Sequence, residues 1–510
     1  MKQNLLIIII NLLPENLYGI LFLCYFSDYL LTQNSGVIMS KKDPKKQHDQ
    51  RQQASDGLCA TTEELTSRGG LLLVLKVFKA LRLKKLADIL FRLPGSNRGY
   101  HNGDILTTLV AMQNEGARCL SDVSRLHKES GLLKRIGIRK IPGANTLSRW
   151  LHRHGHAGVD LINKLNQKVI ATTLQYRQVK EVTLDIDATL IETDKASATR
   201  TYQNHRGFSM MVGTLVEVGQ VIATQLRHGY VSPNFDNIGF IKTCRKLLPK
   251  GIRLKRVRSD SAGYQHKVID YLIRHHTEFV IRVAMNPSIS RRIAALSGMD
   301  WQRLRCKDGS LSNHQWVACF KYQMYRSDHV FDLVIQRTLK PLAFQKKRAA
   351  KLLGQQPVLE MFVDDTDQYD YHGIATNIKG RNNSEIVHLY NQRGEHSENR
   401  IKELKTDFAA GRTPCSDFSA NALYVAVCAL SFNVFALMRH GLPPRMRHAR
   451  ASTLRVDLFG LAGKIVYHSR QWKLKLPDGY LSLLSRALAT LRDHLGEVLP
   501  DLQSSLIQQD

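Results

Sequence analysis

Two short segments place aspartates where apolar strands are expected, and a carboxylate has no obvious structural use there. Asp185 and Asp187 alternate along a strand predicted at 182–191, so both side chains point to one face. Asp260 follows the apolar strand predicted at 254–257. A buried carboxylate without a partner is costly, and a bound cation would offset that cost. An aspartate that caps a helix or turn is the default explanation of either segment taken alone.

A third acidic position lies in a predicted helical stretch at 384–408. Glu398 and Lys405 in this stretch are seven residues apart, about two helical turns, so they share one helix face. Tyr390 and Arg393 precede the glutamate, and Arg393 and Lys405 would flank it with cations suited to phosphate groups. A solvated helix with alternating charges is the commoner explanation when such a stretch stands alone.

Carboxylates on three neighbouring elements suit a site for two divalent cations. Mg²⁺ prefers hard oxygen ligands, typically a few carboxylates together with water and substrate phosphate. Two such ions about 4 Å apart stabilise the negative charge that develops on the attacking and leaving oxygens of a phosphodiester. The candidates for this role are Asp185 or Asp187, then Asp260, and a glutamate of the helical stretch.

The charge of the chain indicates a polyanionic partner. The 510 residues include 73 Lys and Arg against 44 Asp and Glu, a formal net charge of +29. Each neutralised phosphate releases counterions and adds affinity for nucleic acid. The basic residues are spread along the chain, which favours a broad nucleic-acid footprint over a membrane-targeting arm. A ribosome-associated or membrane-surface protein is the alternative class.

Two features bear on localisation. The eight cysteines are scattered without a C-x-x-C pair, so we expect free thiols in a cytoplasmic protein and no zinc ribbon. Segment 1–38 is an apolar leader, but neither of its apolar runs reaches the roughly 18 to 20 residues that span a bilayer. Met39 begins a polar sequence typical of a soluble protein. We therefore interpret 1–38 as a mis-called start, with secretion or anchoring as the alternative.

The next part of the chain is predicted to be helical. Segment 39–65 is polar and lacks periodicity, which predicts a disordered basic linker. Apolar residues at helical spacing then predict a small helical domain at 66–165. This domain is a candidate for DNA binding, with a possible recognition helix at 145–154. A packing or dimerisation module is the alternative for the same region.

Strands and helices alternate in the remainder of the chain. This alternation predicts an α/β catalytic core formed by 180–290 and 376–440. The segment between them, 291–375, is predicted to be a β-rich insertion. A helix at 418–438 is apolar enough to suggest a membrane span, but polar residues interrupt it, so a buried core helix is favoured. The last segment, 441–510, is predicted to be helical.

Together the three acidic segments resemble the DDE transposases of bacterial insertion sequences, which carry a Tyr-Arg-Glu-Lys signature. Asp187, followed by Ala-Thr, matches the first aspartate of that family, and Asp260 matches the second. The signature residues are Tyr390, Arg393, Glu398 and Lys405. The resemblance extends over about residues 65–440 and includes the pair Gly69-Gly70.

The match departs from the family pattern in two places. The signature usually has three residues between arginine and glutamate, whereas this sequence has four, which leaves Glu395 as an alternative to Glu398. The spacing of Glu398 from Lys405 is the usual one, so Glu398 is preferred. Asp185 competes with Asp187 for the first position. The Asp-x-Thr pattern favours Asp187, and Asp185 is then a supporting residue behind the metal ligands.

The resemblance implies an RNase H-like catalytic domain with a β-rich insertion, and cut-and-paste DNA transposition. Asp187, Asp260 and Glu398 would be the catalytic, metal-binding residues, holding two Mg²⁺ ions for which Mn²⁺ would substitute. The other three signature residues would bind DNA. The implied partners are double-stranded DNA, as terminal inverted repeats and target DNA, and a second copy of the chain in a homodimer on DNA. No membrane partner is expected.

Two rival functions fit the same residues. A nuclease of the same fold would cut DNA without joining it. A catalytically inactive DNA-binding protein would bind the repeats without metal-dependent cutting. The presence of all three carboxylates argues against the inactive protein.

Overall fold

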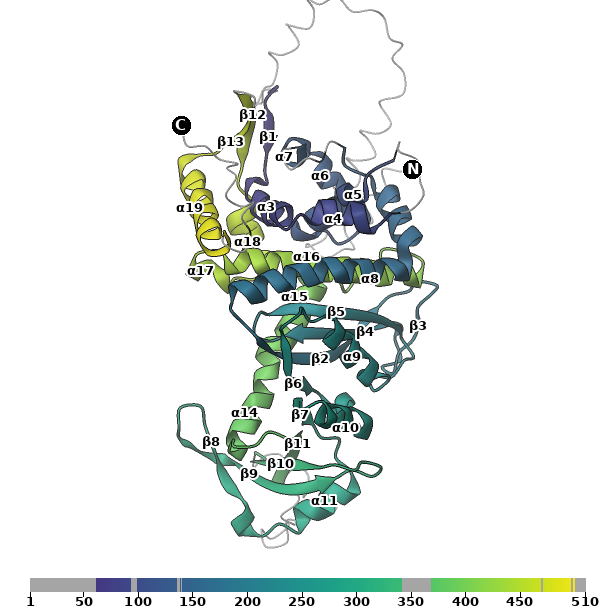
Figure 1. The fold of residues 1–510 in the computed structure, drawn as a ribbon, viewed down its shortest axis with the longest axis vertical. Coiled ribbons are helices and arrows are strands. Elements are labelled where there is room, and N and C mark those ends of the chain that lie inside the picture. The colour runs from purple at the N-terminus through teal and green to yellow at the C-terminus, as the bar shows by residue number, and fades with distance from the viewer. Residues whose placement is uncertain are drawn as a thin grey trace, which may run out of the picture. The chain divides into compact units, whose positions relative to one another are not determined.

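The computed structural model describes residues 61–92, 99–134, 138, 140–341, 368–468, 471–496 and 499. The apolar leader predicted at 1–38 and most of the linker predicted at 39–65 lie outside the described residues. The last residues of that linker form a strand, β1 (Glu64–Thr66). The described residues from Glu64 onward belong to one unit, and Figure 1 shows its elements.

Helices occupy the region before the main sheet, as the apolar spacing predicts. Their bounds are α3 (Leu72–Ala80), α4 (Leu83–Leu90), α5 (Asn102–Asn114), α6 (Val123–His127), α7 (Ser130–Lys134) and α8 (Ala144–Tyr176). The helix predicted at 145–154 is only the first part of α8. Gly155 interrupts α8 with a non-helical backbone (φ 42°, ψ −134°), a positive φ that glycine adopts at little cost. The sequence therefore indicated the start of this helix but not its length.

Ten strands of the described residues form one mixed sheet. Their bounds are β2 (Glu181–Glu192), β3 (Thr199–Arg200), β4 (Arg206–Leu215), β5 (Gln220–His228), β6 (Arg253–Ser259), β7 (Glu278–Arg282), β8 (Gln302–Arg305), β9 (Leu311–Gln323), β10 (Val330–Leu339) and β11 (Tyr369–Thr376). Neighbours follow the order β3-β4-β2-β6-β7-β11-β10-β9-β8, and β5 pairs with β4. Only the β2–β6 and β6–β7 pairs among these strands are parallel. The alternation of strands and helices thus gives the predicted mixed α/β architecture.

The segment predicted as a β-rich insertion extends the same sheet. Its strand β11 pairs antiparallel with β7, with Ile374 opposite Arg282. β10, β9 and β8 then continue the sheet outward. The β character of 291–375 is therefore seen in its described strands, while residues 342–367 lie outside the described part of the chain.

Helices pack against the sheet, and the alternating side chains of one strand belong to two different hydrophobic cores. The helices in this part are α9 (Asn237–Leu247), α10 (His266–Arg274), α11 (Pro287–Ala294), α14 (Asn383–Arg393) and α15 (Asn399–Asp407). On β7, Phe279 and Ile281 belong to the core that includes α9 and α10, whereas Val280 belongs to the core that includes α14. This period-two pattern is that of a strand buried on both faces.

The N-terminal helices share their core with the end of the chain. Their apolar residues form one cluster with the elements that follow α15. Those elements are α16 (Phe418–His440), α17 (Pro444–Arg447), α18 (Ala451–Leu454), β12 (Gly463–His468), β13 (Gln471–Lys475) and α19 (Asp478–Leu495). β12 pairs with both β13 and β1. The C-terminal region, predicted to be helical, therefore also contains strands, which contact the start of the described chain.

Helix α16 is a buried core helix, as predicted. Among the described helices it is the one with the length and apolarity of a membrane span, and its apolar window is entirely buried inside the protein. Asn433 on this helix accepts a hydrogen bond from the Val221 N–H at 2.8 Å and donates one to Asn166 Oδ1 at 2.7 Å. These bonds satisfy polar groups that would be costly to leave unpaired, and they join α16 to α8 and β5.

Candidate active site

Asp187 and Asp260 lie on neighbouring segments of the sheet. Strands β2 and β6 are parallel, with Ile186 opposite Ser259, and each aspartate follows at the next position. Asp260 immediately follows β6 and caps the next turn, because its Oδ1 accepts a hydrogen bond from the Ala262 N–H at 3.1 Å. Capping therefore explains one hydrogen bond of the Asp260 carboxylate. The structure also brings the two predicted aspartates together.

The Asp187 carboxyl lies in a poorly solvated place beside charges of both signs. Its side chain is 20% exposed, and Arg393 Nη2 lies 3.3 Å from its Oδ1. Burial raises the pKa of Asp187, the Arg393 guanidinium opposes that rise, and the carboxyl of Asp260 adds to it. Two such carboxylates repel each other, so a cation between them would lower their electrostatic energy.

Arg393, which was predicted to bind DNA, points into the protein. The residue is 5% exposed, and its Nη2 also donates to the Ile186 carbonyl at 2.9 Å. The end of α14 is thereby attached to β2 beside the first aspartate. The structure brings Arg393 into the site, but with its guanidinium against Asp187. Its contact with DNA remains a prediction.

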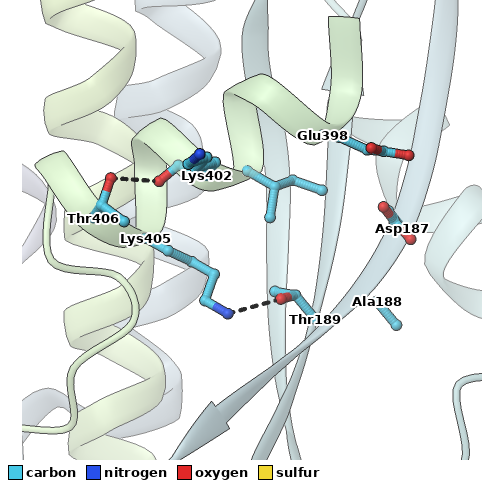
Figure 2. Close-up of a pocket in the computed structure, with 8 residues that line it drawn as sticks. Asp187, Ala188, Thr189, Glu398, Lys402, Lys405 and Thr406 are labelled. Atoms are coloured by element: carbon cyan, nitrogen blue, oxygen red, sulfur yellow. Dashed lines mark hydrogen bonds between the residues drawn. The ribbon is translucent and has the colours of Figure 1, made fainter. Parts of the chain in front are cut away.

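Glu398 shares a cavity with Asp187. The cavity has a volume of about 330 Å³, and its lining consists of Asp187, Ala188, Thr189, Glu398, Ile401, Lys402, Lys405 and Thr406. Figure 2 shows the two carboxylates at one end of this cavity and the Lys405 side chain reaching toward Thr189. Glu398 is exposed. In the described part of the chain no three His, Cys, Asp or Glu residues are gathered closely enough to hold a metal ion. Glu398 therefore lies near Asp187 at this cavity, but the described residues do not form a ready-made metal cluster.

The other two residues of the predicted signature, Lys405 and Tyr390, lie on α15 and α14. Lys405 Nζ donates to Thr189 Oγ1 at 2.9 Å and to the Leu190 carbonyl at 2.7 Å, and burial lowers the pKa of this lysine. Tyr390 is half-buried on α14, where burial raises the pKa of its phenol and Arg393 opposes the rise. Three residues of the predicted signature, Arg393, Glu398 and Lys405, thus lie beside β2, with the lysine in the cavity wall.

Asp185, the competitor of Asp187, is engaged elsewhere. It is fully buried, and both of its carboxylate oxygens accept hydrogen bonds from Arg258. Sequence reasoning missed Arg258. A signal was available, because Arg258 precedes Asp260 by two residues as Asp185 precedes Asp187, and equal offsets on paired parallel strands place the two charges opposite each other.

A π turn accommodates the unusual spacing of the signature. Helix α14 ends at Arg393, the π turn covers Gly394–Glu398, and α15 continues at Asn399. Residues five apart on an α-helix point about 140° away from each other. A π turn instead closes its hydrogen bond over five residues and so takes up one extra residue. The widening lets Arg393 and Glu398 both face β2 despite the additional residue between them.

A family comparison gives the class of the protein. The family model described as Transposase DDE domain group 1 matches residues 58–495. This match defines the chain as a DDE-type transposase, an enzyme that cleaves DNA. The chain belongs to the family Transposase DDE domain group 1.

Comparison with solved structures gives a weaker result. The chain is similar to a piggyBac transposase in a cryo-EM structure of the synaptic complex with hairpin DNA. The sequences are 12% identical, the match covers 86% of this chain and 87% of the other, and the TM-score is 0.41. A TM-score this low does not establish a common fold. No curated protein matches the chain.

The donor set fits the divalent metal ions that DDE transposases generally use. Asp187 and Asp260 offer hard oxygen donors whose mutual repulsion a cation would relieve. Glu398 offers a third carboxylate in the same cavity as Asp187. The arrangement therefore suits a divalent cation bound by the two aspartates. Glu398 would complete the ligand set when the ion is bound.

Proposed function

We propose that this transposase binds the terminal inverted repeats of an insertion sequence, cuts the DNA there in a metal-dependent reaction, and joins the cut strand to target DNA. The observation that carries this proposal is the position of Asp187, which lies next to Asp260 across the paired strands β2 and β6 and shares a cavity with Glu398. The net charge of +29 supports DNA as the partner. A homodimer that pairs two transposon ends is part of the same proposal.

We interpret the catalytic core as RNase H-like. The support is the strand order β5-β4-β2-β6-β7, in which three antiparallel strands are followed by two strands parallel to β2. In this interpretation β8 to β11 form the insertion between the second aspartate and the glutamate. The helices before β2 would contribute to recognition of the DNA ends.

The proposed roles of the side chains follow from their positions. Asp187, Asp260 and Glu398 would hold two Mg²⁺ ions, with Mn²⁺ as a substitute, and these ions would stabilise charge on the attacking and leaving oxygens. Lys405 in the cavity wall and Tyr390 on α14 would contact the DNA backbone. Arg393 neutralises Asp187 in the DNA-free chain and would share its charge with a phosphate once DNA is bound. Cleavage would free a 3′-OH, which then attacks the second strand or the target.

A strand-transfer assay separates the proposal from its rivals. The full chain is incubated with a labelled transposon end and an unlabelled target plasmid, in Mg²⁺ or in EDTA. Metal-dependent cutting followed by joining of the label to the target is the expected result. Cutting without joining would indicate a nuclease. Binding of the end without cutting would indicate an inactive DNA-binding protein.

The π turn gives a prediction about helix register. Deleting Gly394 is expected to keep cleavage within about tenfold of the intact protein, because residues four apart on a regular α-helix share a face. Inserting one alanine after Gly394 is expected to reduce cleavage by at least about 100-fold, because Glu398 then turns away from Asp187. The measurement is the rate of end cleavage, with Gly394→Ala as the control. Equal rates in the deletion and insertion variants would contradict the role of the register.

A further inference from the structure

Arg258 is a charged residue buried at the centre of the sheet, next to the candidate site. It is 1% exposed, and Asp185, its partner on β2, is 0% exposed. Arg258 Nε donates to Asp185 Oδ1 at 2.6 Å and Nη2 donates to Asp185 Oδ2 at 2.7 Å. The pair therefore has the planar two-bond geometry in which a guanidinium binds a carboxylate most strongly.

The third side of the guanidinium reaches the helix over the sheet. Arg258 Nη1 donates to the main-chain carbonyl of Leu389 on α14 at 2.7 Å. This carbonyl immediately precedes Tyr390, and α14 leads through Arg393 into the π turn that carries Glu398. The side chain of Arg258, on β6, is thus hydrogen-bonded both to β2 and to α14.

Two of the three attachment points, Asp185 and Arg258, have matching places in the sequence. Asp185 precedes Asp187 by two residues on β2, and Arg258 precedes Asp260 by two residues at the end of β6. Residues two apart on a strand point to the same face, so each member of the buried pair lies just behind a candidate metal ligand. A shift of α14 or a slip of either strand would break at least one of the three hydrogen bonds.

We propose that Arg258 is a positioning residue, which sets the spacing of Asp187, Asp260 and Glu398 by fixing β2, β6 and α14 to one another. The inference rests on the proposed metal-dependent cleavage. Removing two charges from water is expensive, and a buried ion pair is often no more stable than a well-packed apolar pair. Its best-attested benefit is to specify one register. A site whose ligands come from three separate segments needs that specification.

The test compares a double variant with a matched control. In Asp185→Leu/Arg258→Met both charges are removed together, so no unpaired charge stays buried. Arg258→Lys keeps the charge but loses the two-pronged geometry. Arg256→Met is the control, because Arg256 lies on the same strand, is 8% exposed and pairs with Glu278 on β7 rather than with α14.

Four quantities are measured for each variant. The first two are the midpoint of thermal unfolding and the affinity for the labelled DNA end. The other two are the rate of cleavage at a series of Mg²⁺ concentrations and the affinity for Mn²⁺, measured from the paramagnetic resonance signal of the free ion. Hydrogen exchange of the α14 amides reports directly on the attachment of that helix. The double variant is expected to bind the end normally, to lose cleavage by about 100-fold, and to need more Mg²⁺ and Mn²⁺ than the intact protein. Faster exchange in α14 is expected in both Arg258 variants and not in Arg256→Met.

The possible outcomes separate this inference from the proposed function. A double variant with normal cleavage, normal metal dependence and normal α14 exchange would overturn the positioning role. If the double variant does not fold, Arg258→Lys decides the matter by the same quantities, and metal dependence equal to that of Arg256→Met would overturn the role. An intact protein that binds the end but never cleaves it would instead contradict the proposed function.

Discussion

Replacing Asp260 with asparagine is expected to reduce metal-dependent cleavage of a transposon end by roughly three orders of magnitude. Asparagine keeps the size of the side chain but removes the negative charge and one of the two carboxylate oxygens. A metal ligand contributes several kcal/mol to stabilising the transition state, and each 1.36 kcal/mol corresponds to about tenfold in rate. Glu398→Gln is expected to behave in the same way, because that carboxylate shares the cavity with Asp187.

Binding of DNA should survive these substitutions, since each removes a negative charge that repels phosphate. The measurement is the single-turnover rate of cleavage in Mg²⁺, with binding of the same fragment followed in parallel. Asp308→Asn is a suitable control, because Asp308 is an exposed residue in the turn between β8 and β9. Full cleavage by both Asp260→Asn and Glu398→Gln would remove these residues from the proposed site.

The second large effect is expected from Gly70→Ala, far from the carboxylates. A Cβ atom at Gly70 would lie 1.6 Å from the carbonyl oxygen of Leu458 and 2.9 Å from Cα of Phe459. Both are main-chain atoms, so the backbone itself must move to make room. Overpacking of a core typically costs 1 to 3 kcal/mol, and we expect a loss of about 3 kcal/mol or more in the free energy of unfolding.

Thermal or denaturant unfolding measures this effect, and Gly479→Ala serves as the control. Gly479 lies on α19, and nothing is within 4 Å of the place where its Cβ would be. Alanine is favoured over glycine in a helix, so this control is expected to be neutral or slightly stabilising. If Gly70→Ala unfolds at the same midpoint as the control, the close contact between the start and the end of the chain is not important for stability.

The sequence was informative where a residue type is unusual for the element that carries it. Asp187 and Asp260 stand out because an apolar strand gives no reason for a carboxylate. The long apolar helix at 418–438 was correctly predicted as a core helix, because Asn433 and the other polar residues in it needed partners inside the protein.

The sequence was least informative where the outcome depends on which distant segments meet. The buried pair of Asp185 and Arg258 depends on the register of β2 against β6, which is 73 positions away along the chain. The inward orientation of Arg393 depends in the same way on the contact of α14 with β2. The hairpin of β12 and β13 was missed because its partner strand, β1, comes nearly 400 residues earlier in the chain, at the end of a segment without periodicity.

The contact between Gly70 and Leu458 also bears on how a ribosome makes this protein. The helices at the beginning of the chain are synthesised first, but their apolar residues share a core with α16 and the elements after it. At 5 to 20 residues per second, the C-terminal partners follow after roughly 20 to 80 seconds. Until then the early helices expose apolar surface and cannot settle into the native arrangement. A polypeptide released early is therefore expected to aggregate or be degraded, so that cells accumulate the complete enzyme rather than a stable N-terminal fragment able to occupy transposon ends.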